Sequence, residues 1–425
     1  MLIEFRVENH RSVRDEQALT MEAGSLGTSD DLRVRKIDGH GKPLLPVAAL
    51  YGANASGKSN VLSAVAFLRG AVLHSHRRWP PDEGVPREQF SWGPESGKPS
   101  LFEITFLLHG VRHQYGFVTD NERFTEEWLY VWPVGRRQMW FEREGESFKF
   151  GSHLQGENRV VEEITGKNAL FLSAAAQYRH EQLMPIYSWF RAMRVRASSD
   201  RLGGQVPFYQ LRTAFRMGRS SEQLGFFDGE ETNLEVDALK DLLRAADVGI
   251  VDMRVEDVEE EIETSNGPRR IRRPRIFFRH QSEAKNAWLP LEKESQGTLT
   301  LVGLAPAIID ALGRGGVLFV DELEASLHPL VGAYIVRQFN DPETNPKGAQ
   351  LIFTTHDTNL LGSSLGEPAL RRDQIWLTEK NSEGATILYP LTDYKPRKAE
   401  NLERGYLQGR YGAIPFLGEL ARYGT

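Results

Sequence analysis

The chain has no cysteine and no continuous run of 18 apolar residues. Without cysteine, disulfides, zinc–thiolate sites and cysteine nucleophiles are excluded, and the composition fits a cytoplasmic protein. Without a long apolar run, we expect no membrane-spanning segment. The N-terminus also lacks a basic stretch followed by an apolar core, so no secretory signal is expected.

A strong excess of positive charge is missing too. The net charge of −6 argues against a surface coated in basic charge for nonspecific nucleic-acid binding. The 425 residues allow two or three domain-sized units, and the 40% hydrophobic content is enough for a core. The patterning divides the chain into an N-terminal lobe (1–165), a largely helical insertion (166–294) and a C-terminal lobe (295–425).

The hydrophobic pattern predicts a mixed α/β protein. Segments 2–9 and 47–51 are expected to be strands, and 60–69 a helix, from their spacing of apolar residues. Short alternating segments between residues 101 and 132 are typical of an antiparallel meander. A helix–strand–helix–strand series is expected over 295–357.

The segment Gly52–Ser59 matches the P-loop pattern G-x-x-x-x-G-K-[ST] without a mismatch, between a predicted strand and a predicted helix. The glycines let the backbone N–H groups approach phosphates. Lys58 supplies a positive charge to those phosphates, and the Ser59 hydroxyl is a ligand for Mg²⁺. The alternative, a glycine- and serine-rich surface loop, does not explain the strand–loop–helix context. The expected nucleotide-binding residues here are Gly52, Asn54, Gly57, Lys58, Ser59 and Asn60.

A second strand, Gly316–Val320, ends in Asp321 and Glu322. An aspartate at a strand end can hold Mg²⁺, and the next glutamate is placed to act as general base toward water. Many strands end in an acid, so the pattern is informative because a P-loop precedes it. The following segment, 325–329, is either a loop that crosses a dimer interface or the start of a helix with proline in its first turn.

Ser295 and Gly297 open an apolar helical stretch 26 residues before Asp321. A hydroxyl residue and a glycine at a helix start make an anion-binding N-terminus. The alternative is a plain serine cap. Because the P-loop already provides one phosphate site, a second is most useful for the γ-phosphate of ATP held by another subunit.

Two polar residues complete the candidate site. His356 follows the apolar strand 351–354 and is predicted to sense the γ-phosphate; a structural histidine is the alternative. Gln177 follows an apolar segment and is a candidate Mg²⁺ ligand, with an ordinary surface glutamine equally compatible.

Residues 257–275 change abruptly from acidic to basic across Asn266-Gly267-Pro268, which predicts an exposed hairpin. Its arginines could follow a nucleic-acid backbone or neutralise the acidic strand opposite, and the second interpretation is slightly favoured. They are Arg269, Arg270, Arg272, Arg273 and Arg275. A weaker candidate cluster for nucleic-acid contact is Arg191, Arg194 and Arg196.

The order P-loop, Gln, Ser-x-Gly, strand-Asp-Glu and strand-His resembles that of ABC-type ATPases. The opening, 5–12, is similar to the first strand and turn of RecF, SMC and Rad50 proteins. Within that branch, Glu294–Thr298 and Asp321–Pro329 resemble the prokaryotic AAA-family ATP-binding proteins of abortive-infection and other anti-phage systems. The RloA/AbiL-type, retron-associated and Septu-type ATPases are examples, and residues 400–416 resemble their ending.

This resemblance implies an ABC-type head with a helical signature subdomain. It implies a homodimer closed on ATP, in which Ser295 and Gly297 of one subunit complete the site around Lys58 of the other. It also implies a separate toxin or nuclease partner that the ATPase controls. No long coiled coil lies between Gln177 and Ser295, so a chromosome-spanning SMC or Rad50 is not expected. About 70 residues follow His356 without clustered acids, so a fused Toprim nuclease is not expected either.

Three functions are compatible with the nucleotide residues. The first is an ATPase switch in a defence complex. The second is a RecF-like repair ATPase, which shares every catalytic residue with the first and differs in its partner. The third, a P-loop enzyme acting alone on a small molecule, does not need the signature at Ser295 and Gly297.

Overall fold

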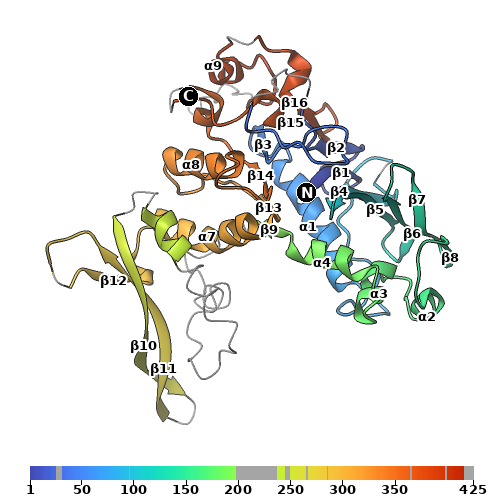
Figure 1. The fold of residues 1–425 in the computed structure, drawn as a ribbon, viewed down its shortest axis with the longest axis horizontal. Coiled ribbons are helices and arrows are strands. Elements are labelled where there is room, and N and C mark those ends of the chain that lie inside the picture. Colours follow the sequence, from blue (N-terminus) through green and yellow to red (C-terminus); the bar gives the residue numbers. More distant parts are fainter. Residues whose placement is uncertain are drawn as a thin grey trace, which may run out of the picture. The chain divides into compact units, whose positions relative to one another are not determined.

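The computed structural model describes residues 1–24, 31–94, 96–197, 237–244, 249–264, 267–284, 286–363, 366–397 and 400–415 (Figure 1). The chain forms two compact units. The first comprises Met1–Ala197, Gly315–Glu322 and Val336–Thr425, and the second comprises Ser198–Arg314 and Leu323–Ile335. The division predicted at 165/166 and 294/295 stays a prediction, because compactness does not show which segments fold independently.

A six-stranded mixed sheet lies at the centre of the first unit, in the order β16-β15-β3-β14-β13-β9. Its strands are β3 (Val47–Gly52), β9 (Arg194–Arg196), β13 (Val317–Val320), β14 (Gln350–Thr354), β15 (Ile375–Lys380) and β16 (Thr386–Pro390). Only β16 runs antiparallel to its neighbour; the other pairs are parallel. Both β13 and β14 are buried at every residue, as expected of parallel strands covered on both faces.

A seven-stranded antiparallel sheet, in the order β2-β1-β4-β5-β6-β7-β8, also belongs to the first unit. These strands are β1 (Leu2–Glu8), β2 (Gln17–Thr20), β4 (Ser100–Leu108), β5 (Val111–Thr119), β6 (Phe124–Trp132), β7 (Gln138–Glu144) and β8 (Ser147–Phe150). In β6, buried residues alternate with half-buried ones, so one face of the sheet packs on the core and the other faces outward. The predicted strand at 2–9 and the antiparallel meander predicted between residues 101 and 132 are confirmed.

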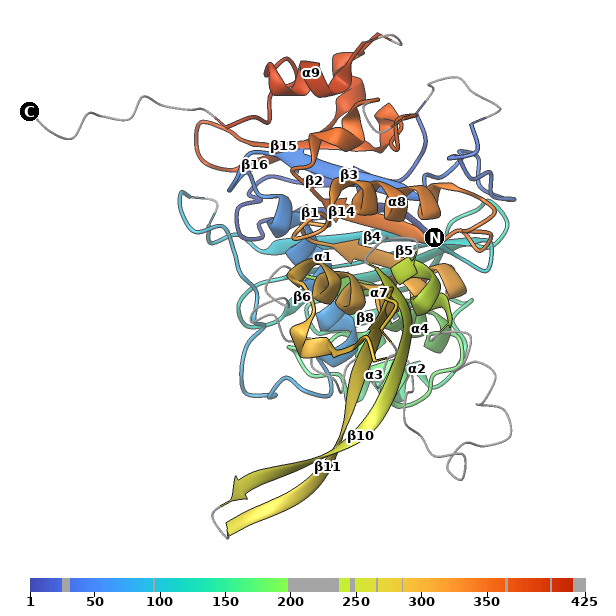
Figure 2. The same cartoon turned by 90° about the vertical axis from the view of Figure 1, so that its left-hand side faces the viewer.

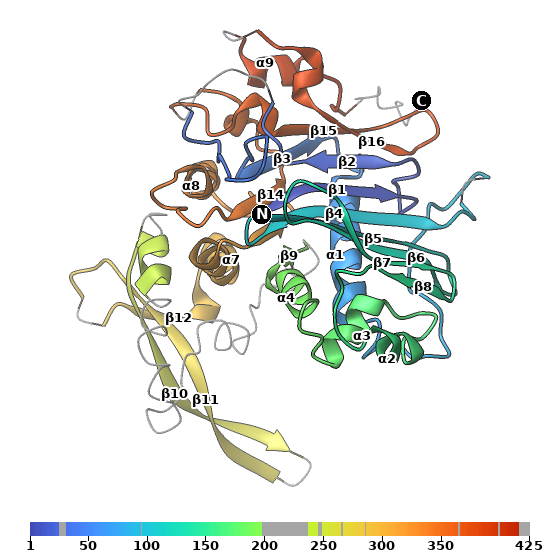
Figure 3. The ribbon, with the colours of Figure 1, turned by 45° about the vertical axis from the view of Figure 1, so that its right-hand side comes forward.

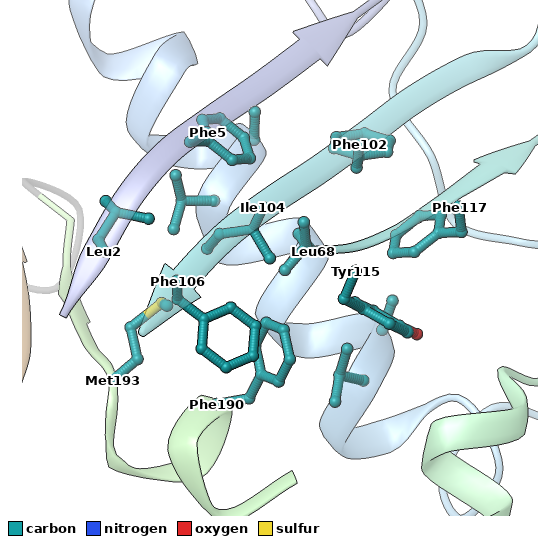
Figure 4. Close-up of a cluster of buried hydrophobic side chains, with 14 of the residues drawn as sticks. Leu2, Phe5, Leu68, Phe102, Ile104, Phe106, Tyr115, Phe117, Phe190 and Met193 are labelled. Atoms are coloured by element: carbon teal, nitrogen blue, oxygen red, sulfur yellow. The ribbon is translucent and has the colours of Figure 1, made fainter. Parts of the chain in front are cut away.

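Helix α1 (Lys58–His74) runs beside the antiparallel sheet (Figure 3). It buries Val61, Leu62, Val65, Leu68 and Val72, a spacing that places apolar side chains on one face of a helix. Leu68 meets Phe102, Ile104 and Phe106 of β4 in the core (Figure 4). The remaining helices of this unit are α2 (Asn158–Glu163), α3 (Phe171–Gln177), α4 (Met184–Ala192), η3 (Thr358–Leu361), η4 (Arg372–Gln374), η5 (Leu391–Tyr394) and α9 (Leu402–Leu407).

The second unit contains a long two-stranded hairpin of β10 (Ile250–Thr264) and β11 (Gly267–His280) (Figure 2). The short strand β12 (Trp288–Pro290) pairs with the base of β11. The turn η2 (Leu291–Lys293) then leads into α7 (Gln296–Arg314). Helix α8 (Pro329–Asn340) begins at a proline, as one of the two alternatives for 325–329 predicts.

Two features of this region differ from the sequence prediction. The hairpin is confirmed but extends well beyond 257–275 at both ends. The region 166–294, predicted to be largely helical, also contains strand β9 of the central sheet.

Helix α7 qualifies the expectation that no segment spans a membrane. Among the described residues, it alone is long and apolar enough to do so, judged by length and composition only. Of the window that passes this test, 56% is buried inside the structure, as in the core helix of a globular protein. The search for a continuous run of 18 apolar residues did not select α7, because Thr300, Gly303 and Asp310 interrupt its apolar sequence.

Candidate nucleotide site

The P-loop connects β3 to α1 and packs against strands β15 and β16. Gly57 has φ +111°, a conformation that favours glycine. A Cβ on Gly57 would lie 2.0 Å from Thr386 Oγ1, and one on Gly52 would lie 2.4 Å from the Thr378 carbonyl oxygen. The two motif glycines are therefore required by close packing as well as by the turn.

Lys58 is buried, at 5% exposure, within the loop that precedes it. Its Nζ donates hydrogen bonds to the carbonyl oxygens of Gly52 at 2.8 Å and Ala53 at 3.1 Å. These bonds hold the ammonium group over the loop, where phosphate oxygens bind in a P-loop. The geometry fits the predicted phosphate-binding role.

Asp321, Ser59 and Thr354 meet at the carboxyl ends of neighbouring strands. Ser59 Oγ donates to Asp321 Oδ1 at 2.9 Å, and Thr354 Oγ1 donates to the same oxygen at 2.7 Å. Asp321 is 3% exposed and Thr354 is fully buried. A serine hydroxyl beside an aspartate carboxylate supplies the oxygen ligands that Mg²⁺ prefers, with its remaining positions left for phosphate and water. The pair predicted to hold Mg²⁺ therefore fits that ion.

Glu322 follows directly, in an unusual backbone conformation. Its φ is +53°, which is uncommon for a residue other than glycine and is often found at functional sites. Its backbone N–H donates to Thr354 Oγ1 at 2.7 Å. Thr354 therefore contacts both acidic residues, through the carboxylate of one and the backbone of the other.

A cavity of about 410 Å³ opens over the P-loop. It is lined by Asn54, Ala55, Ser56, Gly57, Lys58, Ser59, Asn60, Glu322 and His356. The parallel register of β13, β14 and β3 explains this convergence, because the carboxyl ends of parallel strands meet at one edge of the sheet. The structure thus brings together the P-loop, the second acid and the histidine, from segments about 300 residues apart.

Sequence reasoning missed the polar residues that support the loop. Asn60 Nδ2 donates to Ser12 Oγ at 2.6 Å, and Ser12 Oγ lies 2.8 Å from Thr386 Oγ1. Thr386 Oγ1 also donates to the Ser56 carbonyl at 2.8 Å. Lys380 Nζ donates to Thr386 Oγ1, and burial lowers the pKa of this lysine. Isolated hydroxyl residues give no sequence signal, but Thr354 at the end of an apolar strand could have been found.

Ser295 and Gly297 lie in the second unit, at the start of α7. Ser295 Oγ accepts the Thr298 backbone N–H at 3.1 Å, so it caps the helix. A Cβ on Gly297 would lie 2.7 Å from the Ser326 carbonyl oxygen. The first turn of α7 therefore packs closely on the segment that follows Glu322. The cap predicted as the alternative is present, and the role toward ATP stays a prediction.

Gln177 is not brought to the metal residues, so its assignment as a Mg²⁺ ligand is wrong. It ends α3, and the ring of the next residue, Tyr178, lies 6.3 Å from that of His76. His76 follows the C-terminal end of α1, whereas Ser59 lies at its N-terminal end. A helix of 17 residues is about 25 Å long, which separates the two positions. The apolar segment before Gln177 is the buried helix α3.

The hairpin places acids opposite bases. Glu256 pairs with Arg275, Glu259 with Arg272 and Glu261 with Arg270 in the strand register. Directly opposed charges of opposite sign stabilise a strand pair. This arrangement favours the neutralising interpretation, and nucleic-acid contact by these arginines stays a prediction. In the weaker cluster, Arg194 and Arg196 lie in strand β9.

The solved structures that are similar to this chain include SMC head domains. The Smc head domain with a coiled coil and joint derived from Pyrococcus yayanosii has 10% identity and a TM-score of 0.44, covering 96% of this chain and 99% of that chain. The SMC head domain from Thermotoga maritima has 12% identity and a TM-score of 0.39, covering 92% of this chain and 98% of that chain. No curated protein matches.

A family profile matches residues 47–362, from the strand before the P-loop to just beyond His356. The family is described as "AAA domain, putative AbiEii toxin, Type IV TA system". The match covers well over half of the 425 residues. The chain therefore belongs to this AAA-domain family, as the resemblance of its motifs to AAA-family ATP-binding proteins implied.

Proposed function

We propose that this chain is an ATP-hydrolysing subunit that dimerises on ATP and thereby controls a separate toxin or nuclease. The observation that supports this most strongly is the convergence of Lys58, Ser59, Glu322 and His356 around one cavity, with Asp321 bonded to Ser59. A phosphate-binding loop, a metal-binding pair and a candidate base thus share one site.

Each residue has a distinct role in this proposal. Lys58 binds the β- and γ-phosphates of ATP. Its ammonium group gives up its hydrogen bonds to the loop carbonyl oxygens and donates to phosphate oxygens instead. Ser59 and Asp321 hold Mg²⁺, which neutralises phosphate charge when bound. The Glu322 carboxylate accepts a proton from the attacking water while the water oxygen bonds to the γ-phosphorus. The bond from that phosphorus to the bridging oxygen breaks, and ADP and phosphate leave. His356 donates a hydrogen bond to the γ-phosphate.

The dimer is proposed from the start of α7. Ser295 and Gly297 stand at the N-terminus of a 19-residue helix, where the helix dipole favours an anion. In the proposal they contact the γ-phosphate of ATP bound at Lys58 of the second copy. ATP then joins the two copies, and hydrolysis releases them.

The effector and the cellular setting extend the same proposal. The family description names a toxin and a toxin–antitoxin system, which supports a toxin or nuclease partner held in check by this ATPase. A cytoplasmic location fits such a complex. Nucleic-acid contact through the arginines of β11 would be an additional signal to the ATPase. Toxicity of the partner gene when this chain is absent, and its relief when the chain is restored, would support this assignment.

Glu322→Gln tests the mechanism. This variant keeps the phosphate and metal ligands but loses the base, so it should bind ATP, fail to turn it over and accumulate as a dimer. Lys58→Ala should fail at ATP binding and stay monomeric. Phosphate release and solution mass with and without ATP provide the two measurements. Parental hydrolysis by Glu322→Gln would refute the assignment of the base, and a monomer with bound ATP would refute the dimer.

A further inference from the structure

One end of the antiparallel sheet carries a compact group of arginines and aromatic rings. Arg112 lies in β5 and Tyr130 and Trp132 in β6, while Arg136 and Arg137 lie in the turn that follows β6 (Figure 1). Arg112 and Trp132 are directly paired in the strand register. We call these five residues the arginine platform.

Two guanidinium groups of the arginine platform rest on aromatic rings. Arg112 Cζ lies 4.6 Å from the Trp132 ring centroid, and Arg137 Cζ lies 4.5 Å from that of Tyr130. Such cation–π contacts orient a planar group and reduce the conformational entropy it loses on binding a ligand. These two arginines are therefore partly preorganised although their side chains are exposed.

The arginines of the platform lack acidic partners. Within the described parts of the chain, Arg112, Arg136 and Arg137 form no side-chain hydrogen bond or ion pair. By contrast, Arg6 on the outward face of the same sheet bonds Glu4 and Glu16.

Two carboxylates near the platform bond groups other than its arginines. Glu142 accepts the Tyr130 hydroxyl at 2.7 Å, and Glu22 bonds Lys42 at 2.7 Å. The three arginines are thus a local positive surface on a chain of net charge −6. Because these three arginines lack acidic partners in the part of the chain that the structure describes, and the chain has a negative net charge, they indicate a ligand of negative charge.

We propose that the arginine platform binds single-stranded nucleic acid. Guanidinium edges bind phosphate oxygens in pairs, and guanidinium planes stack on unpaired bases. Arg112 and Arg137 already lie over aromatic rings, so the side of each guanidinium group that faces away from its ring is available to a base. Every nucleotide supplies both a phosphate and a planar base, whereas an acidic protein segment supplies carboxylates and offers a ring only where an aromatic residue accompanies them. The proposal does not depend on ATP binding or hydrolysis.

Fluorescence anisotropy tests the proposal with labelled oligo-dT and oligo-U of about 20 nucleotides, a length that exceeds single-fold site sizes. The full chain should bind, and Arg112→Ala with Arg137→Ala should weaken binding at least about 10-fold. Loss of two phosphate contacts should lower the slope of log K against log salt by about 1.4. Arg112→Lys with Arg137→Lys, which keeps charge but not planarity, should bind with intermediate affinity.

A matched control removes two exposed arginines elsewhere in the same unit, Arg78→Ala with Arg123→Ala, and should leave affinity unchanged. The variant Arg270→Ala with Arg272→Ala removes arginines of the hairpin. It therefore distinguishes binding at the hairpin from binding at the arginine platform. Thermal unfolding of every variant verifies that the fold is retained. Unchanged binding by the Arg112/Arg137 alanine variant, loss confined to the hairpin variant, or absence of binding by the parent overturns the proposal. Tighter binding of labelled polyglutamate than of an oligonucleotide of equal charge also overturns it, in favour of an acidic protein partner.

Discussion

The Thr354 hydroxyl donates a 2.7 Å hydrogen bond to Oδ1 of Asp321, while its oxygen accepts the backbone N–H of Glu322 at 2.7 Å. A single buried hydroxyl at the end of β14 thus fixes the carboxylate proposed to hold Mg²⁺ and the backbone of the proposed base. Two residues further along the chain, His356 lines the same cavity. The strand end therefore links His356, the proposed phosphate sensor, to both acids.

Thr354→Val should slow ATP hydrolysis with little effect on ATP binding. The valine has a similar shape but removes one hydroxyl donor to the Asp321 carboxylate, which keeps its bond from Ser59, and it removes the acceptor of the Glu322 N–H. Loss of such bonds costs about 1.4 kcal/mol, which corresponds to a roughly 10-fold decrease in kcat. Steady-state phosphate release and equilibrium binding of a fluorescent ATP analogue separate the two effects.

Thr354→Ser retains the hydroxyl and should recover most of the activity. Thr119→Val is the matched control, because this fully buried threonine bonds only the carbonyl oxygens of Asp120 and Arg123. Equal kcat values for Thr354→Val and the parent, or a serine variant as slow as the valine one, would contradict the positioning role.

Gly297→Ala should impair the start of α7. The added Cβ would lie 2.7 Å from the Ser326 carbonyl oxygen, so the helix turn or the segment after Glu322 must shift. A misplaced helix start should weaken ATP-dependent dimerisation by at least about 10-fold if it contacts ATP in the second copy. Solution mass over a concentration series, with Glu322→Gln in the background to prevent turnover, gives the dimer affinity.

Gly313→Ala in the same helix is the control, because a Cβ there meets no atom within 4 Å. Alanine is the better helix former, so this variant should be neutral or slightly stabilising. A Gly297→Ala dimer of parental affinity would show that the helix start is not part of the composite site.

The residues of the candidate nucleotide site could be predicted to lie together because they follow strands with a strong apolar signal. Lys58, Asp321 and His356 each lie at or just beyond the carboxyl end of such a strand, and parallel pairing brings those ends together. The meander of β4, β5 and β6 was predictable for a similar reason, since its strands alternate.

The sequence failed where position depends on tertiary packing. Gln177 follows an apolar segment, but that segment is the buried helix α3 at the far end of α1. The three-residue strand β9 is too short for a periodic signal and is fixed by its pairing with β13. Ser12 and Thr386 meet although they are 374 residues apart, and neither stands out in the sequence.

His280→Ala should destabilise the second unit. His280 Nε2 lies 2.7 Å from Glu294 Oε1, and the Glu294 side chain is only 4% exposed. Removing the imidazole leaves a buried carboxylate without this partner, which should lower the free energy of unfolding by about 1–3 kcal/mol. Urea unfolding monitored by the fluorescence of Trp288, with the other tryptophans replaced by phenylalanine, reports on this unit. Glu283→Ala, at an exposed position near His280, should leave the unfolding midpoint unchanged.

His10→Gln should reduce the acid sensitivity of the first unit. Burial lowers the pKa of His10 to about 4, with the Arg11 charge adding to the effect, and Nε2 contacts Ser63 Oγ at 2.8 Å. In the unfolded chain the pKa is near 6.5. Between these values the unfolded state takes up a proton that the folded state does not, so stability falls as pH decreases from 6.5 toward 4. At about pH 5 the loss from this residue is about 2 kcal/mol.

The measurement is the free energy of unfolding in urea at about pH 7.5 and about pH 5, for the parent and for His10→Gln. The difference between the two pH values should be smaller in the variant by about 2 kcal/mol. His113, whose pKa burial also lowers to about 4, keeps its own contribution, so some acid sensitivity should remain. His109→Gln, at an exposed position, should retain the full parental difference. If His10→Gln retained it as well, His10 would take up its proton equally in the folded and unfolded chains, and burial beside Ser63 and Phe102 would not keep it neutral.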